Sequence, residues 1–419
     1  MSDSVAPTPV DDRSREGRWE RTVGALRYHD YRYLWLSQVC SALAQWMDEV
    51  VRGWIAYQLT GSPLVLGIVA ASRHAPLLVL GPWAGVFADR FDRRWQLVAA
   101  QWANTLVDLT LVGLLVSERL EAWHLAVLAL AAGSAQSFMQ PSRQAMLPRL
   151  VPRSDLMSGI ALLSVAFNTS RSVGPAVAGL LIASVGPAGA ALGQVVVHFL
   201  GGVSILLMRE VPAPAPGQQG SLWGDLVGGL RYVWRTPPLA LLLVISGVPM
   251  IVGWPYATLL PVYAKDILDI GPQGLGLLLS AVGIGAISGL LILGYLGDLP
   301  GKGGKMLLSM AGFGLAMLVF SYSPWLALSL LPLFGIGLFS NAFHAFVNHL
   351  LHVKTEDAFR GRVMSLYALD RGLHPFGSLI VGALGQFLGA PAAVAITGAL
   401  LILLTLGAAL RWPSLRDLA

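Results

Sequence analysis

The chain has 419 residues, of which 55% are hydrophobic and only 12% are charged, and its net charge is +5. A soluble globular domain carries about 25% charged residues, so this composition excludes an ordinary water-soluble protein and favours a surface that faces lipid. The basic residues lie in short clusters between apolar blocks rather than in a long stripe, so no nucleic acid is expected as a partner. Cys40 is the single cysteine, which excludes an intrachain disulfide.

Residues 1–33 are predicted to form a cytoplasmic tail. Residues 1–20 are rich in Asp, Arg and Pro, and they lack the apolar core and small-residue cleavage site of a signal peptide.

Twelve apolar blocks follow the tail, each of about the 20 residues that a helix needs to cross a bilayer. Turn residues such as Gly61, Ser62 and Pro63 separate them. The expected spans are residues 34–59, 64–88, 95–116, 122–141, 156–184, 186–208, 238–263, 272–296, 303–321, 324–350, 362–388 and 391–411. The sequence therefore predicts an all-α membrane protein with twelve transmembrane helices.

Lys and Arg residues follow every even-numbered span, whereas the opposite connections hold only Arg119 and Lys265. Because cytoplasmic loops carry the excess of positive charge, we expect both termini in the cytoplasm and the chain in the plasma membrane of a bacterium. The clusters are Arg90, Arg93 and Arg94; Arg143, Arg149 and Arg153; Arg209, Arg231 and Arg235; Lys302 and Lys305; and Lys354, Arg360 and Arg362.

The longest separator, residues 209–237, falls at the midpoint and begins with alternating prolines. It is predicted to be a cytoplasmic linker between two pseudo-symmetric six-helix bundles, residues 34–208 and 238–411. Residues 412–419 would then form a cytoplasmic C-terminal tail.

A short motif occurs at equivalent places in the two halves. Both copies read Gly, three residues, Asp, three residues and a basic residue. A small residue lets helices approach closely, and an Asp near a helix end can bridge to Arg or to a helix N-terminus. We predict a latch that forms in one conformation and breaks in another. Its members are Gly85, Asp89, Arg90, Arg93, Arg94, Gly294 and Asp298.

Residues 85–94 resemble the signature loop of major facilitator transporters, with Asp92 where a Gly is usual. Residues 148–153, 229–237 and 361–365 are similar to segments of the drug and siderophore exporter branch, which includes macrolide efflux proteins and enterobactin exporters. The resemblance implies a rocker-switch transporter that exports a small amphipathic organic compound by proton antiport. Gly174, Pro175 and Gly179 resemble its antiporter motif, although an ordinary kinked helix would look the same.

Polar side chains recur on one face of four spans, which predicts a shared water-filled cavity, because a charge at the bilayer centre costs about 2.5–3.5 kcal/mol. The candidates for lining it are Gln45, Arg52, Asn168, Arg171, Asn341, His344, Asn348 and Arg371. For Arg171 and Arg371, substrate contact and structural pairing are both open. Trp46 and Trp254 could stack on a planar ligand or simply mark a membrane interface.

Asp48, Glu49, Asp370 and His374 are the candidates for taking and releasing a proton. Asp48 stands four residues before Arg52, and Asp370 four before His374, so each pair is expected to touch. The alternatives are fixed ion pairs that lock helices together, or direct substrate contact.

Arg73, His74 and Asp108 belong to no stripe, and we expect them to pair helices. His349 and His352 are three residues apart without a third ligand nearby, so no metal site and no cofactor are expected. The glycines from Gly283 to Gly289 lie in an apolar span, which favours helix packing over a dinucleotide loop.

We expect a monomer that contacts the lipid bilayer, a small-molecule substrate and protons. The same fold would also serve a metabolite importer or a lysolipid flippase, and a membrane receptor that does not transport is a further alternative. No catalytic motif or large soluble domain is visible, so an enzyme is not expected.

Overall fold

The computed structural model describes residues 23–209, 222–297, 299–416 and 418, and these contain helices but no strands. In the first half, η2(Gly24–Arg27) precedes α2(His29–Thr60), α3(Pro63–Arg90), α4(Arg93–Val116), α5(Ala122–Leu150) and α6(Leu156–Leu206). After α7(Leu222–Arg235), the second half contains α8(Pro237–Val248), η3(Pro249–Gly253), η4(Trp254–Leu259), α9(Leu260–Val262), η5(Tyr263–Ile267), α10(Gly271–Leu296), α11(Lys302–Ser321), α12(Leu326–Lys354), α13(Asp357–Leu369), η6(Asp370–Leu373), α14(His374–Leu388), α15(Ala390–Arg411) and η7(Pro413–Leu415).

Eight of the described helices are long and apolar enough to cross a membrane by length and composition alone. One of them, the 51-residue α6, holds two spans that meet at Gly186, whose φ of 77° takes it out of the helical conformation. The polar residues within α2 and α5, and the break between α13 and α14, keep three further spans out of that count. With these included, the described chain has twelve spans in two six-helix bundles, as the sequence predicts.

Short connections join the spans at one end of the molecule, which we call the hairpin end. The turn after α2 needs only Gly61 and Ser62: Gly61 adopts a left-handed φ of 60°, and the Ser62 hydroxyl accepts a hydrogen bond from the amide of Val65. The other hairpin connections are residues 117–121, Gly186, residues 268–270, residues 322–325 and Gly389. The opposite end carries α7, and we call it the linker end.

Two pairs of helices join the halves: α3 packs on α14, and α6 packs on α10. The two pairs are related by the internal repeat, because α10 corresponds to α3 and α14 to the first span of α6. A Cβ atom on Gly67 would lie 2.5 Å from the Ser378 carbonyl oxygen, and one on Gly276 would lie 2.5 Å from that of Pro175. Glycine therefore allows the backbones of the two halves to touch.

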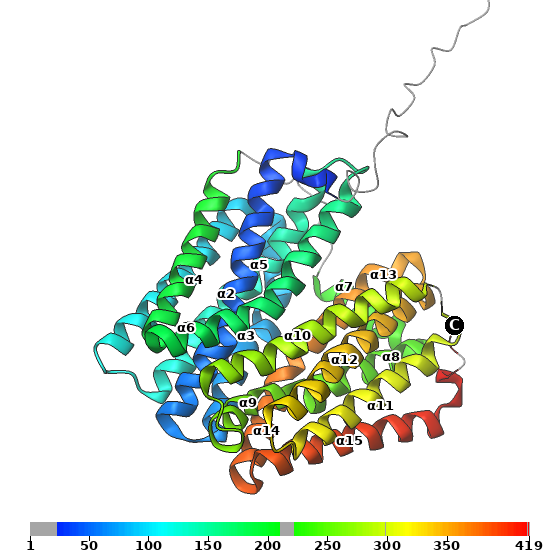
Figure 1. The fold of residues 1–419 in the computed structure, drawn as a ribbon. Helices are drawn as coiled ribbons and strands as arrows, with labels where there is room; N and C mark the ends of the chain where they lie inside the picture. The colour runs from blue at the N-terminus through cyan, green and yellow to red at the C-terminus, as the bar shows by residue number, and fades with distance from the viewer. Residues whose placement is uncertain (1–22, 210–221, 298, 417, 419) are drawn as a thin grey trace, which may run out of the picture.

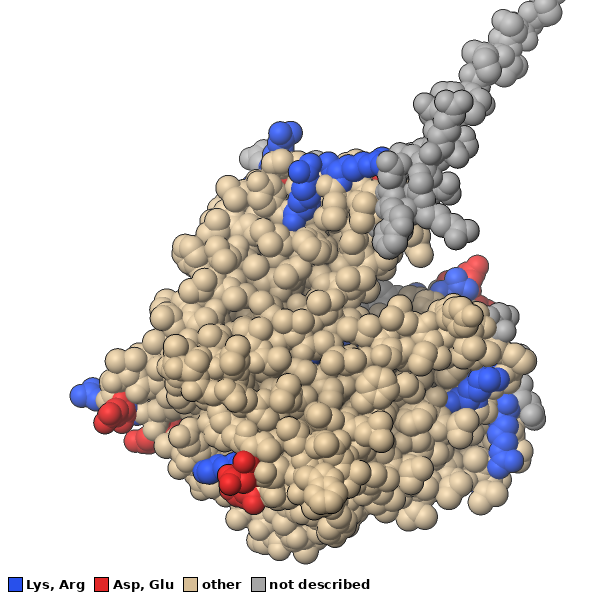
Figure 2. All heavy atoms as spheres, viewed as in Figure 1, with Lys and Arg blue, Asp and Glu red and all other residues tan. Residues whose placement is uncertain are grey.

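The close approaches between the halves lie toward the hairpin end, where the Ser62 hydroxyl donates to Gln386 at 2.7 Å and Tyr57 bonds Asp266. Figure 1 shows the halves diverging toward the side that carries α7, α13 and the C-terminus. In Figure 2 the surface is hollowed between the two lobes on that side.

Charged side chains lie at the two ends of the face in Figure 2, and a broad uncharged belt separates them. This belt is what a lipid-facing surface requires. Lys and Arg predominate at the end that carries η2 and α7, whereas both signs occur at the hairpin end.

Two spans that the sequence predicts as continuous are broken. Span seven passes through π and 3-10 turns between Pro249 and Ile267, and span eleven has a 3-10 turn at Asp370–Leu373. Pro249, Pro255, Pro261 and Pro375 explain the breaks, since proline donates no backbone hydrogen bond and its ring clashes with the carbonyl four residues earlier.

Candidate functional site

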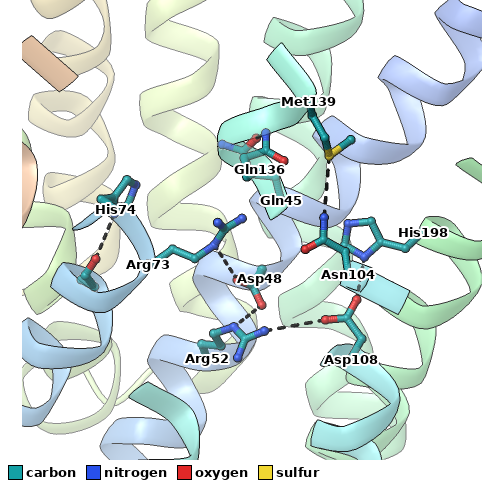
Figure 3. A network of polar contacts seen from close by, with 11 residues as sticks. Gln45, Asp48, Arg52, Arg73, His74, Asn104, Asp108, Gln136, Met139 and His198 are labelled. Carbon is teal, nitrogen blue, oxygen red and sulfur yellow. Dashed lines mark hydrogen bonds and ion pairs between the residues drawn. The ribbon is translucent and has the colours of Figure 1, made fainter. Parts of the chain in front are cut away.

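A network of charged side chains crosses the interior of the first bundle (Figure 3). Arg52 and Asp48, both on α2, form the pair that their spacing predicts, with 2.6 Å between Nε and Oδ1. Arg73 reaches from α3 to the other oxygen of Asp48 at 3.4 Å. Asp48 is thus held between two cations, and both Asp48 and Arg52 are buried.

Asp108 extends this network to α4 and to the second span of α6. Its carboxylate lies 3.7 Å from Nη2 of Arg52 and accepts a 2.6 Å hydrogen bond from Nδ1 of His198. Arg73 and Asp108 therefore pair helices, as predicted. His198 was not predicted, because nothing in its local sequence distinguishes it from a histidine without a partner.

The remaining α2 candidates lie outside this chain of ion pairs. The Gln136 amide donates to Gln45 at 3.1 Å, which joins α5 to α2. Glu49 is exposed, in contrast to its neighbour Asp48.

Arg171 lies between the two halves. Its guanidinium carbon is 5.3 Å from the centre of the Trp46 ring on α2 and 4.7 Å from that of Trp254 in η4. The indole N–H of Trp254 donates to Nε2 of His344 at 3.2 Å, so the Nδ1 of a neutral His344 carries the proton and faces the Tyr367 hydroxyl at 3.3 Å. This arrangement joins α6, α2, η4, α12 and α13.

Asp370 has a different environment from the carboxylates of the first bundle. Its carboxylate accepts a hydrogen bond from the Ser246 hydroxyl of α8, and within the described chain it forms no ion pair. The predicted contact with His374 is wrong, since Nδ1 of His374 lies 3.1 Å from the Ser378 hydroxyl instead. The 3-10 turn explains this, because it aligns residues three apart rather than four.

His374 also meets a histidine of the other half. Its ring centre lies 4.4 Å from that of His74 on α3. Nδ1 of His74 is 3.0 Å from the carbonyl oxygen of Ala70, one turn earlier in its own helix. His74 therefore contributes to helix packing between the halves.

Four other cavity candidates make no side-chain hydrogen bond or ion pair between helices in the described interior. The Asn168 and Asn341 amides donate to Ser164 and Gly337 carbonyls within their own helices, at 2.9 and 3.2 Å. Asn348 is half-buried and Arg371 is exposed.

The latch candidates fall into two groups. Nη1 of Arg93 donates to the Ala145 carbonyl at 3.0 Å, and Nη2 of Arg94 donates to that of Leu206 at 2.8 Å, so both brace the start of α4 against α5 and α6. A Cβ atom on Gly294 would meet no described atom within 4 Å, so the described part of the chain makes no close helix approach there in this conformation. Gly85, Asp89 and Arg90 lie in α3, but their side chains, like all of Asp298, fall outside the described residues.

The antiporter-like motif packs against one helix of each half, α2 in the first and α10 in the second. A Cβ atom on Gly174 would lie 2.8 Å from that of Trp46, and one on Gly179 would lie 2.4 Å from the Pro272 carbonyl oxygen. Its second feature, Pro175, presents the carbonyl against which Gly276 packs. Helix packing likewise explains Gly285, where an added Cβ would meet the Phe334 carbonyl.

Arg143 lies elsewhere than the sequence predicts. The sequence predicts it in a cytoplasmic cluster, but α5 continues to Leu150 and buries Arg143, whose Nη2 donates to the Ser41 hydroxyl at 3.2 Å. The apolar block ends near residue 141, so the hydrophobic pattern predicts a helix that is too short at its C-terminal end.

Comparison with known proteins identifies the family. The transmembrane secretion effector family matches residues 21–417. The staphyloferrin A transporter of Staphylococcus aureus is 26% identical over 90% of this chain and 94% of its own length. The multidrug efflux pump Tap of Mycolicibacterium fortuitum is 28% identical over 80% of this chain and 84% of its own.

The fold has a close counterpart among solved structures. The crystal structure of the nucleoside transporter NupG superposes with a TM-score of 0.75, covering 90% of this chain and 98% of that one at 12% identity. The match along almost the whole chain, together with twelve spans in two bundles, places this protein among membrane transporters rather than enzymes. The chain belongs to the transmembrane secretion effector family of the major facilitator superfamily.

Proposed function

We propose that this protein exports a small amphipathic organic compound in exchange for protons, with the two bundles opening alternately to the two sides of a bacterial plasma membrane. The observation that carries the proposal is Asp370, a carboxyl inside a broken span whose described partner is a hydroxyl rather than a cation. A proton can bind there without leaving a positive charge unpaired. Relatives named for siderophore transport and multidrug efflux support the direction and the class of cargo.

Alternating access is supported by the uneven contact between the halves. Backbones touch toward the hairpin end, at Gly67 and Gly276, whereas the halves diverge toward the linker end. The Lys and Arg clusters favour a cytoplasmic linker end and cytoplasmic termini, so this conformation would be open to the inside. The protein would work as a monomer, since one chain supplies both halves of the path.

Asp370 is the favoured proton carrier among the four candidates. Protonating Asp48 would leave Arg52 and Arg73 facing a neutral group. Glu49 is exposed, and His374 is engaged by Ser378 and His74. The cycle would then couple proton release at Asp370 to movement of the broken spans seven and eleven.

The test is export by everted membrane vesicles that carry the full chain. A screen of antibiotics, dyes and siderophores against a hypersensitive host first identifies a transported compound. Energised, acid-inside vesicles should accumulate that compound, and a protonophore should abolish the accumulation. An importer would deplete the vesicles of the compound, and a lysolipid flippase would move labelled lysolipid rather than the compound.

Matched variants test whether Asp370 couples export to the proton gradient. Asp370→Asn should lose gradient-driven accumulation while retaining exchange of labelled for unlabelled compound. Asp357→Asn, on the exposed start of the same span, should behave as wild type. Coupled export by Asp370→Asn with an unchanged pH dependence would exclude this carboxyl as the carrier, and Glu49→Gln and Asp48→Asn would then be the next variants.

A further inference from the structure

Arg171 is a buried cation whose described neighbours are aromatic rather than acidic. Only 7% of the residue is exposed. Its guanidinium lies over the rings of Trp46 and Trp254 and makes no hydrogen bond or ion pair with the part of the chain that the structure describes. By contrast, Arg52 and Arg73 in the same bundle both reach carboxylates.

Two hydrogen-bond donors at this place have no acceptor in the described structure. Nη2 of Arg171 and Nε1 of Trp46 are both buried and lack a partner among the described residues. A buried donor without an acceptor is costly, and in native proteins it requires an explanation. The indole N–H of Trp254 differs, since His344 accepts it.

Cation–π contact and hydrogen bonding use different parts of a guanidinium. A ring attracts the cation through its face, whereas the N–H groups lie in the guanidinium plane and match carboxylate oxygens. Two indoles around Arg171 therefore leave its in-plane donors for an acceptor that the described part of the chain does not supply. Phe167, whose ring packs edge-on against Trp46 at 5.9 Å, extends the aromatic surface.

The position suits a transported ligand. Trp46 and Arg171 belong to the first half, and Trp254 belongs to a broken span of the second half. The backbone of α6 at Arg171 and Ser172 lies directly against Gly283 of α10. A ligand held here would touch both halves at the seam along which they contact each other.

We propose that Arg171 and the Trp46 indole N–H form a subsite for the anionic group of an aromatic, acidic amphiphile, with Trp46 and Trp254 contacting its apolar body. Cationic compounds would be disfavoured, since they would meet an unneutralised guanidinium. The inference rests on the proposed export function for its physiological meaning, since it names the substrate class, but binding can be measured without transport.

The test is equilibrium binding to the purified full chain in nanodiscs of neutral lipid. The probes are 8-anilino-1-naphthalenesulfonate and N-phenyl-1-naphthylamine, which share an aromatic skeleton and differ in the sulfonate. Fluorescence titrations are corrected with empty nanodiscs. The wild type should bind the sulfonate at least about tenfold more tightly than the neutral amine, which corresponds to about 1.4 kcal/mol.

Variants show which residues cause the preference for the sulfonate probe. Arg171→Gln should weaken sulfonate binding by about tenfold and change amine binding by less than about twofold. Trp46→Phe keeps a ring but removes the N–H, and should weaken only the sulfonate, by about threefold. Arg171→Lys should give an intermediate value, since it keeps the charge and loses the planar fork. Arg411→Gln is the matched control, because Arg411 lies over Trp412 at the far end of α15 and should leave both probes unchanged.

Three outcomes would overturn the inference. They are equal binding of the two probes by the wild type, an unchanged sulfonate affinity in Arg171→Gln, and equal weakening of both probes together with a lower melting temperature. The last would identify Arg171 as a clamp between the halves. The wild-type comparison stands even where a variant fails to fold. Failure of gradient-driven export in vesicles would instead count against the proposed function and leave the binding result intact.

Discussion

The two halves of the molecule hold their interior acidic groups in opposite ways. In the first bundle, Asp48 and Asp108 each contact two partners that can be positive, and Arg52 joins them. In the second bundle, the described partner of Asp370 is the hydroxyl of Ser246. Adding a proton to Asp108 would weaken its contacts with Arg52 and His198, whereas adding one to Asp370 would leave no described cation without its partner. We therefore expect the ion pairs of the first bundle to stay in place during transport, and the carboxyl of the second bundle to respond to pH.

The largest effect is expected where the first bundle loses a shared carboxylate. Asp108→Ala leaves both Arg52 and His198 without that partner and should lower the free energy of unfolding by about 3–5 kcal/mol. Unfolding in mixed detergent micelles measures the change. Asp108→Asn serves as a control of similar shape, and a loss below about 1 kcal/mol for Asp108→Ala would mean that the pairs are not a structural lock.

An intermediate effect is expected at the seam between the bundles. Gly67→Ala places a Cβ atom against the Ser378 carbonyl and should disfavour contact at the hairpin end by about 1–3 kcal/mol. Spin labels at Ser62→Cys and Gln386→Cys, read by pulsed electron resonance, should report longer distances. Gly407→Ala on α15 is the matched control, because its Cβ would meet no described atom within 4 Å. An unchanged distance distribution in Gly67→Ala would show that the helices adjust without separating.

A smaller effect is expected at the responsive carboxyl. Ser246→Ala removes a single hydrogen bond to Asp370 and should lower stability by about 1 kcal/mol, because the carboxyl can take up a proton and no cation is stranded. The same unfolding assay applies. A loss as large as that of Asp108→Ala would remove the distinction between the bundles. The clearer effect of Ser246→Ala should be a shift in the pH dependence of export, since Ser246 is the described partner of Asp370.

The smallest effect is expected at the surface. Asp357 and Arg360 form a pair on α13, with 2.5 Å between their charged atoms and 89% of the Asp357 side chain exposed. Asp357→Asn should change stability by less than about 1 kcal/mol, since water screens exposed pairs. Salt titration should remove even this difference. A larger loss would indicate that exposure is a poor guide to the energy of ion pairs in this chain.

The helices could be predicted closely because lipid imposes a simple length and polarity rule on each span. The breaks at Pro249, Pro255 and Pro375 could not, since proline often lies in membrane helices that stay continuous. Arg143 was misplaced for a related reason: α5 continues beyond its apolar block, and Ser41 of another helix satisfies the guanidinium.

The contacts of the candidate site could be predicted from the sequence only where the two residues lie one turn apart on the same helix. Asp48 and Arg52 lie one turn apart on α2, so their pairing follows from helix geometry. The partners His198 and Ser246 come from other helices, and their contacts depend on how each helix is rotated about its axis. The orphaned donors of Arg171 and Trp46 are likewise visible only once three elements are packed together.

The hairpin end has a mechanical consequence. Each of its short connections joins two spans of the same half, as Gly61–Ser62 joins α2 to α3, so no peptide bridges the two bundles there. Side-chain hydrogen bonds such as Ser62 with Gln386 and Tyr57 with Asp266, together with backbone packing at Gly67, hold that rim together without a covalent link. The covalent tether lies at the other pole, where α7 leads into α8. The two bundles can therefore separate at the hairpin end once these non-covalent contacts break. At the linker end, the covalent connection limits how far the bundles can move apart.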